Sequence, residues 1–336
     1  MRKAVTALLG FTLLMLATIA TAQANGGPHG SYTATADGCA GCHRAHSAPA
    51  PKLLVNTNTA LCLTCHGTGA TGATTNVNDG VYTGTTQGTN NAGLNGGGFT
   101  QATQDTSLSG TASSGAVTSI HNVQGTAGYS STATAWGAGA VVTASPGSTG
   151  VAYDLYCTSC HDPHGSTNYR MIRTTVNGVA VTLADADSAA KSYTATHYYA
   201  GTTQWSISTF CAACHTRYQV TTSASGETSS TDYIFTYRHR VDAPSGAVVN
   251  GITYTFPTNI ALPMSSTDGA APVASPTDNR SMVCLTCHYA HGSKAAMGTN
   301  SGVVAWPGGT TTPNGNARSS LLRLDNRGVC ENCHQK

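Results

Sequence analysis

Six copies of the pattern Cys-x-x-Cys-His account for all 12 cysteines of this 336-residue chain. They are Cys39/Cys42/His43, Cys62/Cys65/His66, Cys157/Cys160/His161, Cys211/Cys214/His215, Cys284/Cys287/His288 and Cys330/Cys333/His334. This pattern is the attachment sequence of c-type haem, in which both cysteines bond to the porphyrin and the histidine ligates the iron. Redox disulfides and zinc sites also use paired cysteines, but neither requires a histidine after the second cysteine in every copy. The motifs therefore predict six covalently bound haem c groups, with the motif histidines as proximal iron ligands.

The first residues read as an export signal. Arg2 and Lys3 precede an apolar run over residues 4–20, and Ala-x-Ala cleavage sequences follow within residues 20–24. We expect residues 1–24 to be a cleaved signal peptide and residues 25–336 to form a single hexahaem cytochrome c domain. No cysteine follows the cleavage site, which argues against a lipid anchor, and no later segment reaches the ~18 apolar residues of a membrane span.

Composition indicates how such a chain would fold. Charged residues make up 9% of the sequence, against roughly 25% in ordinary soluble domains. The net charge of +2 comes without a basic run, which excludes a nucleic-acid-binding face. A chain this poor in Leu, Ile and Phe cannot build a protein core around each of six porphyrins. We therefore predict a mostly irregular fold with a haem-centred core, short helical turns and a few β-hairpins.

The motifs are unevenly spaced and are not tandem repeats of one length. Cys39 and Cys62 begin motifs only 23 residues apart, so their haems should be neighbours. The Gly/Thr/Asn/Ser-rich stretch between His66 and Cys157 lacks helical periodicity and is expected to be a solvent-facing loop layer. Asn-Gly pairs within residues 176–179 and 249–252 predict two-residue hairpin turns, and residues 321–334 predict helical turns.

Seven histidines lie outside the motifs, and six irons would each need a second axial ligand. The seven are His29, His46, His121, His164, His197, His239 and His291. Three of them, His46, His164 and His291, follow a motif histidine by three residues. At that spacing two imidazoles lie on the same side of the backbone and cannot bind one iron from opposite faces. Each of these three is therefore expected to ligate a neighbouring haem.

The order of the motifs resembles a known family. Cys-x-x-Cys-His-x-x-His near the mature N-terminus, a second motif soon after, Cys-Thr-Ser-Cys-His-Asp-Pro-His-Gly at 157–165 and a motif close to the C-terminus are similar to the hexahaem outer-surface cytochromes of extracellular nanowires, the outer-membrane cytochrome S type. The resemblance implies six bis-histidine haems in alternating parallel and T-shaped contacts, continuous across subunit boundaries. The loops between motifs depart from the family, and this chain is shorter.

The resemblance also implies roles for the remaining histidines. His46 is the residue expected to reach into an adjacent subunit of a head-to-tail homopolymer, at the haem on Cys284, Cys287 and His288. The segments around His29, His121 and His239 look like distal-ligand segments of the family. His197 has no such counterpart and is taken as the spare. The proposed distal ligands are therefore His29, His46, His121, His164, His239 and His291.

Ligation by two imidazoles indicates the class of function. An iron with both axial positions filled passes electrons and binds no substrate, and imidazole ligands keep its potential lower than a thioether would. We expect no catalytic residues and no enzyme activity. The prediction is extracellular electron transfer at the cell surface, from envelope electron-donor cytochromes to acceptors such as metal oxides. One alternative is a monomeric electron carrier or metal reductase in the periplasm or at the cell surface. A second, less favoured alternative is a multihaem enzyme with one open iron.

Overall fold

Short elements joined by irregular chain make up the structure. The computed structural model describes residues 29, 39–89, 92–104, 112–135, 137–139, 150–185, 199–200, 206–218, 241, 245–246, 248–249, 252–253, 255–260, 262–266, 278–296, 320–326 and 328–334. Over these ranges no helix exceeds the nine residues of α3 (Asn58–His66) and no strand exceeds four residues. The predicted mostly irregular fold class is thereby confirmed. The predicted signal peptide, residues 1–24, lies outside these ranges, and within them no helix is long and apolar enough to cross a membrane.

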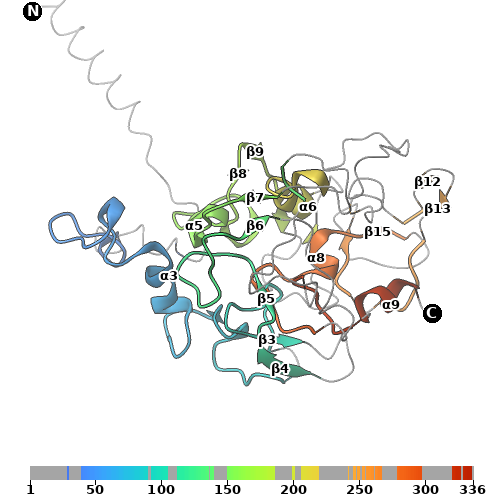
Figure 1. Cartoon of the computed structure of the whole chain (residues 1–336), viewed down its shortest axis with the longest axis horizontal. Coiled ribbons are helices and arrows are strands. Elements are labelled where there is room, and N and C mark those ends of the chain that lie inside the picture. The colour runs from blue at the N-terminus through green and yellow to red at the C-terminus, as the bar shows by residue number, and fades with distance from the viewer. Residues whose placement is uncertain are drawn as a thin grey trace, which may run out of the picture.

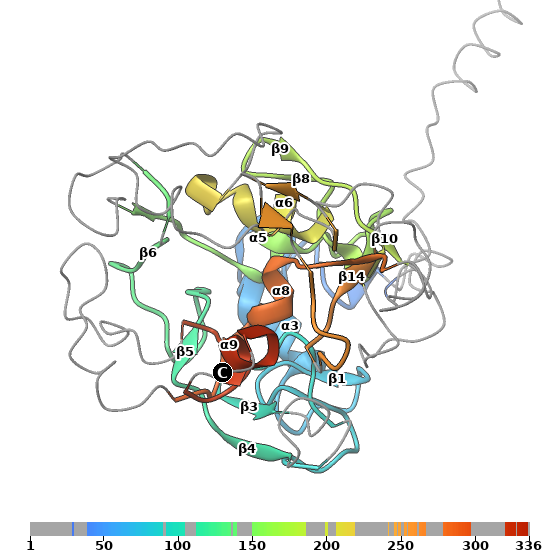
Figure 2. The same ribbon diagram turned by 90° about the vertical axis from the view of Figure 1, so that its right-hand side faces the viewer.

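The helices that carry the motifs follow one another through the molecule. They are α3, α5 (Cys157–Cys160), α6 (Ser206–Ala212), α8 (Cys284–Cys287) and α9 (Gly328–His334). Along the longest axis, α3 and α5 lie at one end, α6 and α8 in the middle and α9 at the other end (Figure 1). Viewed end-on, α3, α5, α8 and α9 gather near the centre (Figure 2). The motifs thus lie in chain order along the body of the protein.

Most strands form two-stranded antiparallel ladders. These are β1 (Thr75–Asn76) with β2 (Val81–Tyr82), β3 (Gln101–Gln104) with β4 (Ser113–Ala116), β6 (Thr134–Ala135) with β7 (Val151–Ala152), β8 (Thr175–Val176) with β9 (Val179–Ala180), β12 (Val248–Val249) with β13 (Ile252–Thr253), and β5 (Ser119–Ile120) with β16 (Gly292–Ser293). A four-stranded sheet has the order β10 (Ala184–Asp185), β11 (Tyr199–Ala200), β14 (Ser265–Ser266), β15 (Arg280–Ser281), with β11 and β14 parallel. The β5–β16 ladder joins distant parts of the chain.

Both predicted hairpins are confirmed as antiparallel strand pairs, β8–β9 and β12–β13. In the first, Asn177 and Gly178 have φ of 46° and 79°. A type I′ turn requires positive φ at both central residues. The Asn177 side chain also donates to the carbonyl of Ala213 at 2.7 Å, which fixes the hairpin beside α6. The Asn-Gly turn of the second hairpin lies outside the described ranges.

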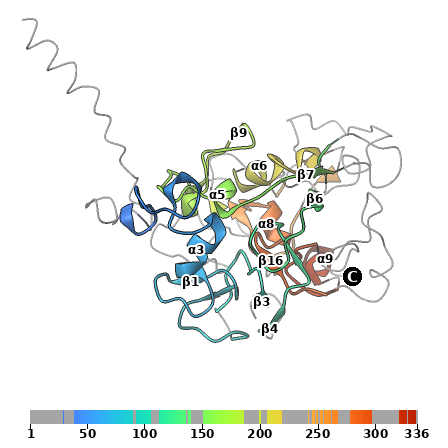
Figure 3. The same ribbon diagram turned by 60° about the vertical axis from the view of Figure 1, so that its left-hand side comes forward.

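Two expectations from the sequence need correction. Of the helical turns predicted over residues 321–334, the structure has α9 at Gly328–His334, whereas Leu321 has a φ of 61°, which is incompatible with a right-handed helix. The stretch between the second and third motifs is not simply solvent-facing, because it contains short strands and buries four apolar side chains, those of Val81, Leu94, Phe99 and Ala102. From the side, β1, β3 and β4 form a lobe below the motif helices (Figure 3). This lobe packs against the fifth motif.

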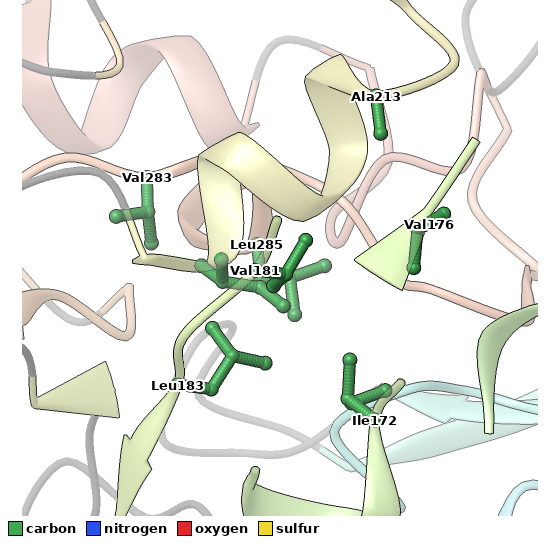
Figure 4. Close-up of a cluster of buried hydrophobic side chains, with 8 residues drawn as sticks. Ile172, Val176, Val181, Leu183, Ala213, Val283 and Leu285 are labelled. Atoms are coloured by element: carbon green, nitrogen blue, oxygen red, sulfur yellow. The ribbon is translucent and has the colours of Figure 1, made fainter. Parts of the chain in front are cut away.

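Two small apolar clusters connect the motif segments. The larger contains Ile172, Val176, Val181, Leu183, Ile207, Ala213, Val283 and Leu285, and it lies between β8–β9, α6 and α8 (Figure 4). The smaller contains Leu262, Leu324 and Val329, with Leu322 and Cys287 packed against it. Each cluster therefore holds together segments that carry different motifs.

Candidate haem-ligation sites

The first, third and fifth motifs share one local structure. In α5 and α8 the two cysteines begin and end a single helical turn, so both thiols project from the same side. The next residue then leaves the helix in an extended conformation, with φ and ψ of −109° and 145° at His161 and −118° and 150° at His288. The amide of His43 donates to the carbonyl of Cys39 at 2.9 Å in the same way. This turn keeps two thiols and one imidazole within reach of one porphyrin.

A three-residue segment, here called the strap, lies against each of these motifs. The straps are Lys52–Leu54, Arg170–Ile172 and Ser320–Leu322. The first residue of each accepts a hydrogen bond from the Nδ1 of the motif histidine, at 3.0 Å for His43, 2.9 Å for His161 and 2.8 Å for His288. The third residue of each forms an isolated β-bridge with that histidine. A carbonyl can only accept, so Nδ1 carries the proton and the Nε2 lone pair points away, ready to bind iron.

Each strap is held in a strained backbone conformation. Its first two residues all have positive φ, between 49° and 61°, and none of the six is glycine. Left-handed backbone at such residues costs roughly 1–3 kcal/mol each and persists where the surrounding structure enforces it. In each case the flanking hydrogen bonds do so: Arg44, Asp162 and Tyr289 donate to the second strap residue at 2.7–2.8 Å. Three copies of one strained turn indicate a common role in orienting the motif histidine.

The second, fourth and sixth motifs lie instead at the carboxyl ends of helices. α3 contains Cys62, Cys65 and His66; α6 contains Cys211; and α9 contains Cys330, Cys333 and His334. His66 Nδ1 lies 2.9 Å from the hydroxyl of Thr75 and 3.2 Å from its carbonyl. An odd motif, its strap and the following even motif thus form a module. We call residues 39–66, 157–215 and 284–334 modules 1, 2 and 3.

Four motif histidines face a histidine from elsewhere in the chain. The ring centroids are 6.1 Å apart for His43 and His164, 6.1 Å for His66 and His29, 6.3 Å for His161 and His291, and 6.1 Å for His215 and His121. With a metal–nitrogen bond of about 2.0–2.1 Å and a ring centroid about 1.2 Å beyond that nitrogen, two imidazoles on one metal have centroids about 6.4–6.6 Å apart. The four pairs fit bis-histidine iron closely.

Four of the non-motif histidines are arranged as two couples, His29 with His164 and His121 with His291. His29 Nδ1 donates to the carbonyl of Pro163, directly before His164. In the same way His121 Nδ1 donates to the carbonyl of Ala290, directly before His291. The second couple is also joined through the backbone, because the His121 amide donates to the His291 carbonyl at 2.8 Å at the end of the β5–β16 ladder. His29 and His164 face the two motif histidines of module 1, and His121 and His291 face the two motif histidines of module 2.

Burial favours the neutral, metal-binding form of three of these imidazoles, those of His66, His121 and His291. Burial, followed by the nearby His161, lowers the pKa of His291 to about 3. Burial and His215 lower the pKa of His121 to about 4, and burial likewise lowers the pKa of His66. A neutral imidazole presents a lone pair to iron at physiological pH, whereas an imidazolium cannot.

Cysteines of successive motifs contact one another in chain order. The Cys62 and Cys157 thiols are hydrogen-bonded, and this contact lowers the pKa of Cys157 to about 7. Cys211 and Cys284 are hydrogen-bonded in the same way, which raises the pKa of Cys211. These two contacts join the first cysteines of motifs two and three and of motifs four and five.

The second cysteines approach one another within each module. After burial, the strongest influence on the pKa of each odd-motif thiol comes from the even motif of its own module: Cys65 acts on Cys42, Cys214 on Cys160 and Cys333 on Cys287. All three pKa values are raised, to about 12 for Cys160 and Cys287. These electrostatic influences and the two hydrogen-bonded thiol pairs link each motif to the next in chain order.

Two motif histidines, His288 and His334, do not belong to the four pairs. Three of the seven other histidines are then left as candidates: His46, which is exposed, and His197 and His239, which lie outside the described ranges. Sequence reasoning found every histidine of the four pairs. It missed the straps and it missed Gly96 and Phe99, which pack on the His291 ring. The Phe99 centroid is 5.0 Å from it, and a Cβ on Gly96 would lie 2.8 Å from its Nδ1.

Comparisons with known proteins agree with the motif pattern. A family model described as "Doubled CXXCH motif" matches residues 29–71 and 150–179. The first range contains module 1, and the second contains the third motif and its strap. A solved structure titled "Outer Membrane Cytochrome S Filament from Geobacter Sulfurreducens" is similar over 89% of this chain and 98% of that chain, with 18% identity and a TM-score of 0.41. The motif order resembles the same group of proteins. A search among curated proteins gave no match.

Proposed function

We propose that this chain is a hexahaem c-type cytochrome that conducts electrons along a line of bis-histidine haems and polymerises head to tail. The observation that carries the proposal is the set of four imidazole pairs at 6.1–6.3 Å, each joining a motif histidine to one from elsewhere. The six motifs would each hold one porphyrin through two cysteine thioethers and supply its iron with one proximal histidine. Bound haem iron would supply one-electron transfer between Fe(III) and Fe(II).

The residues around each iron favour a conductor over an enzyme. In the four pairs a second imidazole would close the position at which a substrate would bind, and Nδ1 hydrogen bonds to carbonyls hold the rings of His29, His43 and His161 in place. Rigid, six-coordinate irons need little rearrangement when their charge changes. The proximity of cysteines in successive motifs would keep successive porphyrins adjacent along the chain. We therefore propose electron transport with no chemical conversion of a substrate.

The pattern of couples supports assembly of copies. His164 of module 2 faces His43 of module 1, and His291 of module 3 faces His161 of module 2. The corresponding residue of module 1 is His46, and residues 1–38 contain no Cys-x-x-Cys-His motif that it could face. If each such histidine faces the odd motif of the module before it, His46 would face His288 in module 3 of another copy. Such a contact is heterologous, and without closure it generates a helical filament.

The same repetition assigns the last distal ligand. His29 precedes module 1 and faces its even motif, and His121 precedes module 2 and faces its even motif. His239 precedes module 3, so it is our proposed partner of His334, while His197 lies within module 2 and is spare. The predicted export signal and the resemblance favour the cell surface, with envelope cytochromes as donors and metal oxides as acceptors. A monomeric carrier or metal reductase is the alternative.

Haem quantification and electron microscopy test the proposal together. The pyridine haemochrome of the purified protein should give six haems per chain, and negative-stain micrographs should show thin, unbranched filaments. His46→Ala should give monomers or short oligomers in which one haem per chain has lost a ligand. His164→Ala is the matched control, because it removes the same motif position but within one chain, and it should still polymerise. A native protein that is monomeric with six low-spin irons would refute assembly and leave the carrier function.

A further inference from the structure

The four imidazole pairs differ in the angle between their rings. The rings of His43 and His164 are nearly parallel, with an interplanar angle of 13°. In the other three pairs the two rings are strongly tilted against each other, by 47° for His29 and His66, 50° for His161 and His291, and 58° for His121 and His215. The pair at the first motif therefore differs in ring orientation from the pairs at the second, third and fourth motifs.

The turn that carries His164 is closed by Asp162. One carboxylate oxygen of Asp162 accepts a hydrogen bond from the His164 amide at 3.0 Å, and the same oxygen lies 3.7 Å from Nδ1 of the ring. A side-chain acceptor two residues before the amide makes this an Asx turn. The Asp162 carbonyl also accepts from the Gly165 amide at 3.0 Å, and the Asp162 amide donates to the strap at Met171. The carboxylate thus contacts both the backbone and the ring of His164, from a turn that is attached to the strap of module 2.

The other distal histidines of the four pairs are oriented by segments outside their own turns. The His291 amide donates to the carbonyl of Gly96 at 2.6 Å, a contact that comes from the lobe before the third motif. His29 and His121 each donate from Nδ1 to a backbone carbonyl of a distant segment. The His164 side chain is 78% exposed, so the packing of neighbouring side chains does little to orient its ring.

The carboxylate at this position belongs to module 2 alone. Asp162 directly follows the motif histidine, and the residues at the equivalent positions of modules 1 and 3 are Arg44 and Tyr289. An Asx turn needs the short acceptor side chain of Asp or Asn, which neither of these residues has. Of the three histidines that follow a motif by three residues, His164 is therefore the one that a carboxylate of its own turn can orient.

We propose that Asp162 positions the His164 imidazole parallel to that of His43 and so gives the haem of the first motif its own low-spin state. The inference rests on the proposed bis-histidine haems. A carboxylate beside the free nitrogen of a ligating histidine fixes the orientation of its ring. Each imidazole interacts through its π orbital with the iron d orbital whose lobes lie perpendicular to the ring.

The angle between the rings decides how the iron d orbitals are split. Two parallel rings act on the same d orbital and separate it in energy from its partner, whereas strongly tilted rings act on both and leave them closer in energy. The half-filled orbital of Fe(III) therefore has one fixed direction at the first haem. Because the electron enters and leaves through this orbital, its direction sets the electronic contact of the first haem with its neighbours.

Electron paramagnetic resonance of the oxidised holoprotein tests the inference. The low-spin signal becomes more anisotropic, with a higher largest g value, as the two rings are tilted away from parallel. His164→Ala should remove one haem's share of the more rhombic signal, which has the lower largest g value. His291→Ala is the matched variant in module 3, and it should remove one haem's share of the more anisotropic signal.

Substitutions at Asp162 test the positioning role. In Asp162→Ala the first haem should stay low-spin, but its largest g value should rise towards that of the tilted sites. Asp162→Asn keeps an oxygen acceptor for the His164 amide and should retain most of the wild-type signal. Asp154→Ala is the matched control, because that carboxylate accepts from the Tyr129 hydroxyl at 3.1 Å, and its spectrum should equal that of the wild type.

Two results would overturn the inference. One is a signal lost in His164→Ala that is as anisotropic as the signal lost in His291→Ala, and this comparison needs no Asp162 variant to fold. The other is a wild-type spectrum in Asp162→Ala with full haem content. A native protein whose irons are not low-spin would instead reject the proposed function, and this inference with it.

Discussion

Removing the imidazole of His291 should convert one of the six irons to the high-spin state. The His291 ring centroid lies 6.3 Å from that of His161, the separation expected for two axial ligands of one iron. Alanine offers no ligand atom, so the iron of the haem on the third motif (Cys157, Cys160 and His161) would keep only His161 as an axial ligand. One sixth of the ferric haem should therefore become high-spin in His291→Ala.

The other sites should be unaffected, because each of the four pairs uses its own two histidines. The double variant His164→Ala/His291→Ala should therefore show one third of the haem as high-spin. Electron paramagnetic resonance at low temperature, quantified against haem content, measures these fractions. Phe99→Leu controls for local disturbance, because it alters the packing 5.0 Å from the His291 ring but keeps the imidazole. A His291→Ala protein with every iron low-spin would refute the ligand assignment.

Three further predictions concern single positions. Gly96→Ala should perturb the spectrum of the third site, because the new Cβ would lie 2.8 Å from the distal imidazole, whereas Gly115→Ala, with its nearest atom at 3.6 Å, should not. Asn168→Ala should lower the free energy of unfolding in a denaturant titration by roughly 2–4 kcal/mol, because its buried amide makes three hydrogen bonds to backbone groups. His239→Ala should turn one haem high-spin in the same resonance assay and His197→Ala none; the opposite result would exchange these two assignments.

The sequence alone predicts the attachment motifs and names every histidine of the four ring pairs. Histidine directly after each cysteine pair defines the proximal ligand, and a second histidine three residues later cannot bind the same iron. That argument assigned His164 and His291 to neighbouring haems, and in the structure their rings lie beside those of His43 and His161. The Asn-Gly hairpin at 177–178 was also predictable, since its turn demands positive φ at both residues.

The straps could not be predicted because their distance from the motif varies. The acceptor carbonyl lies nine residues after the histidine in modules 1 and 2 but 32 residues after it in module 3. Their left-handed residues, such as Lys52 and Arg170, carry no glycine signal. The triple glycine at 96–98 lies in the stretch predicted to face solvent, yet Gly97 and Gly98 are buried. Gly97 is needed because a Cβ there would lie 1.8 Å from the Gly292 carbonyl, a tertiary contact that local sequence does not reveal.

Every iron of this protein is proposed to have two imidazole ligands. Low-temperature electron paramagnetic resonance of the fully oxidised, assembled protein tests it most directly when the spins are counted against the haem content. We predict six low-spin ferric haems per chain and no high-spin signal above trace level. A high-spin signal approaching one iron per chain would contradict the account and would favour an enzyme with one open iron.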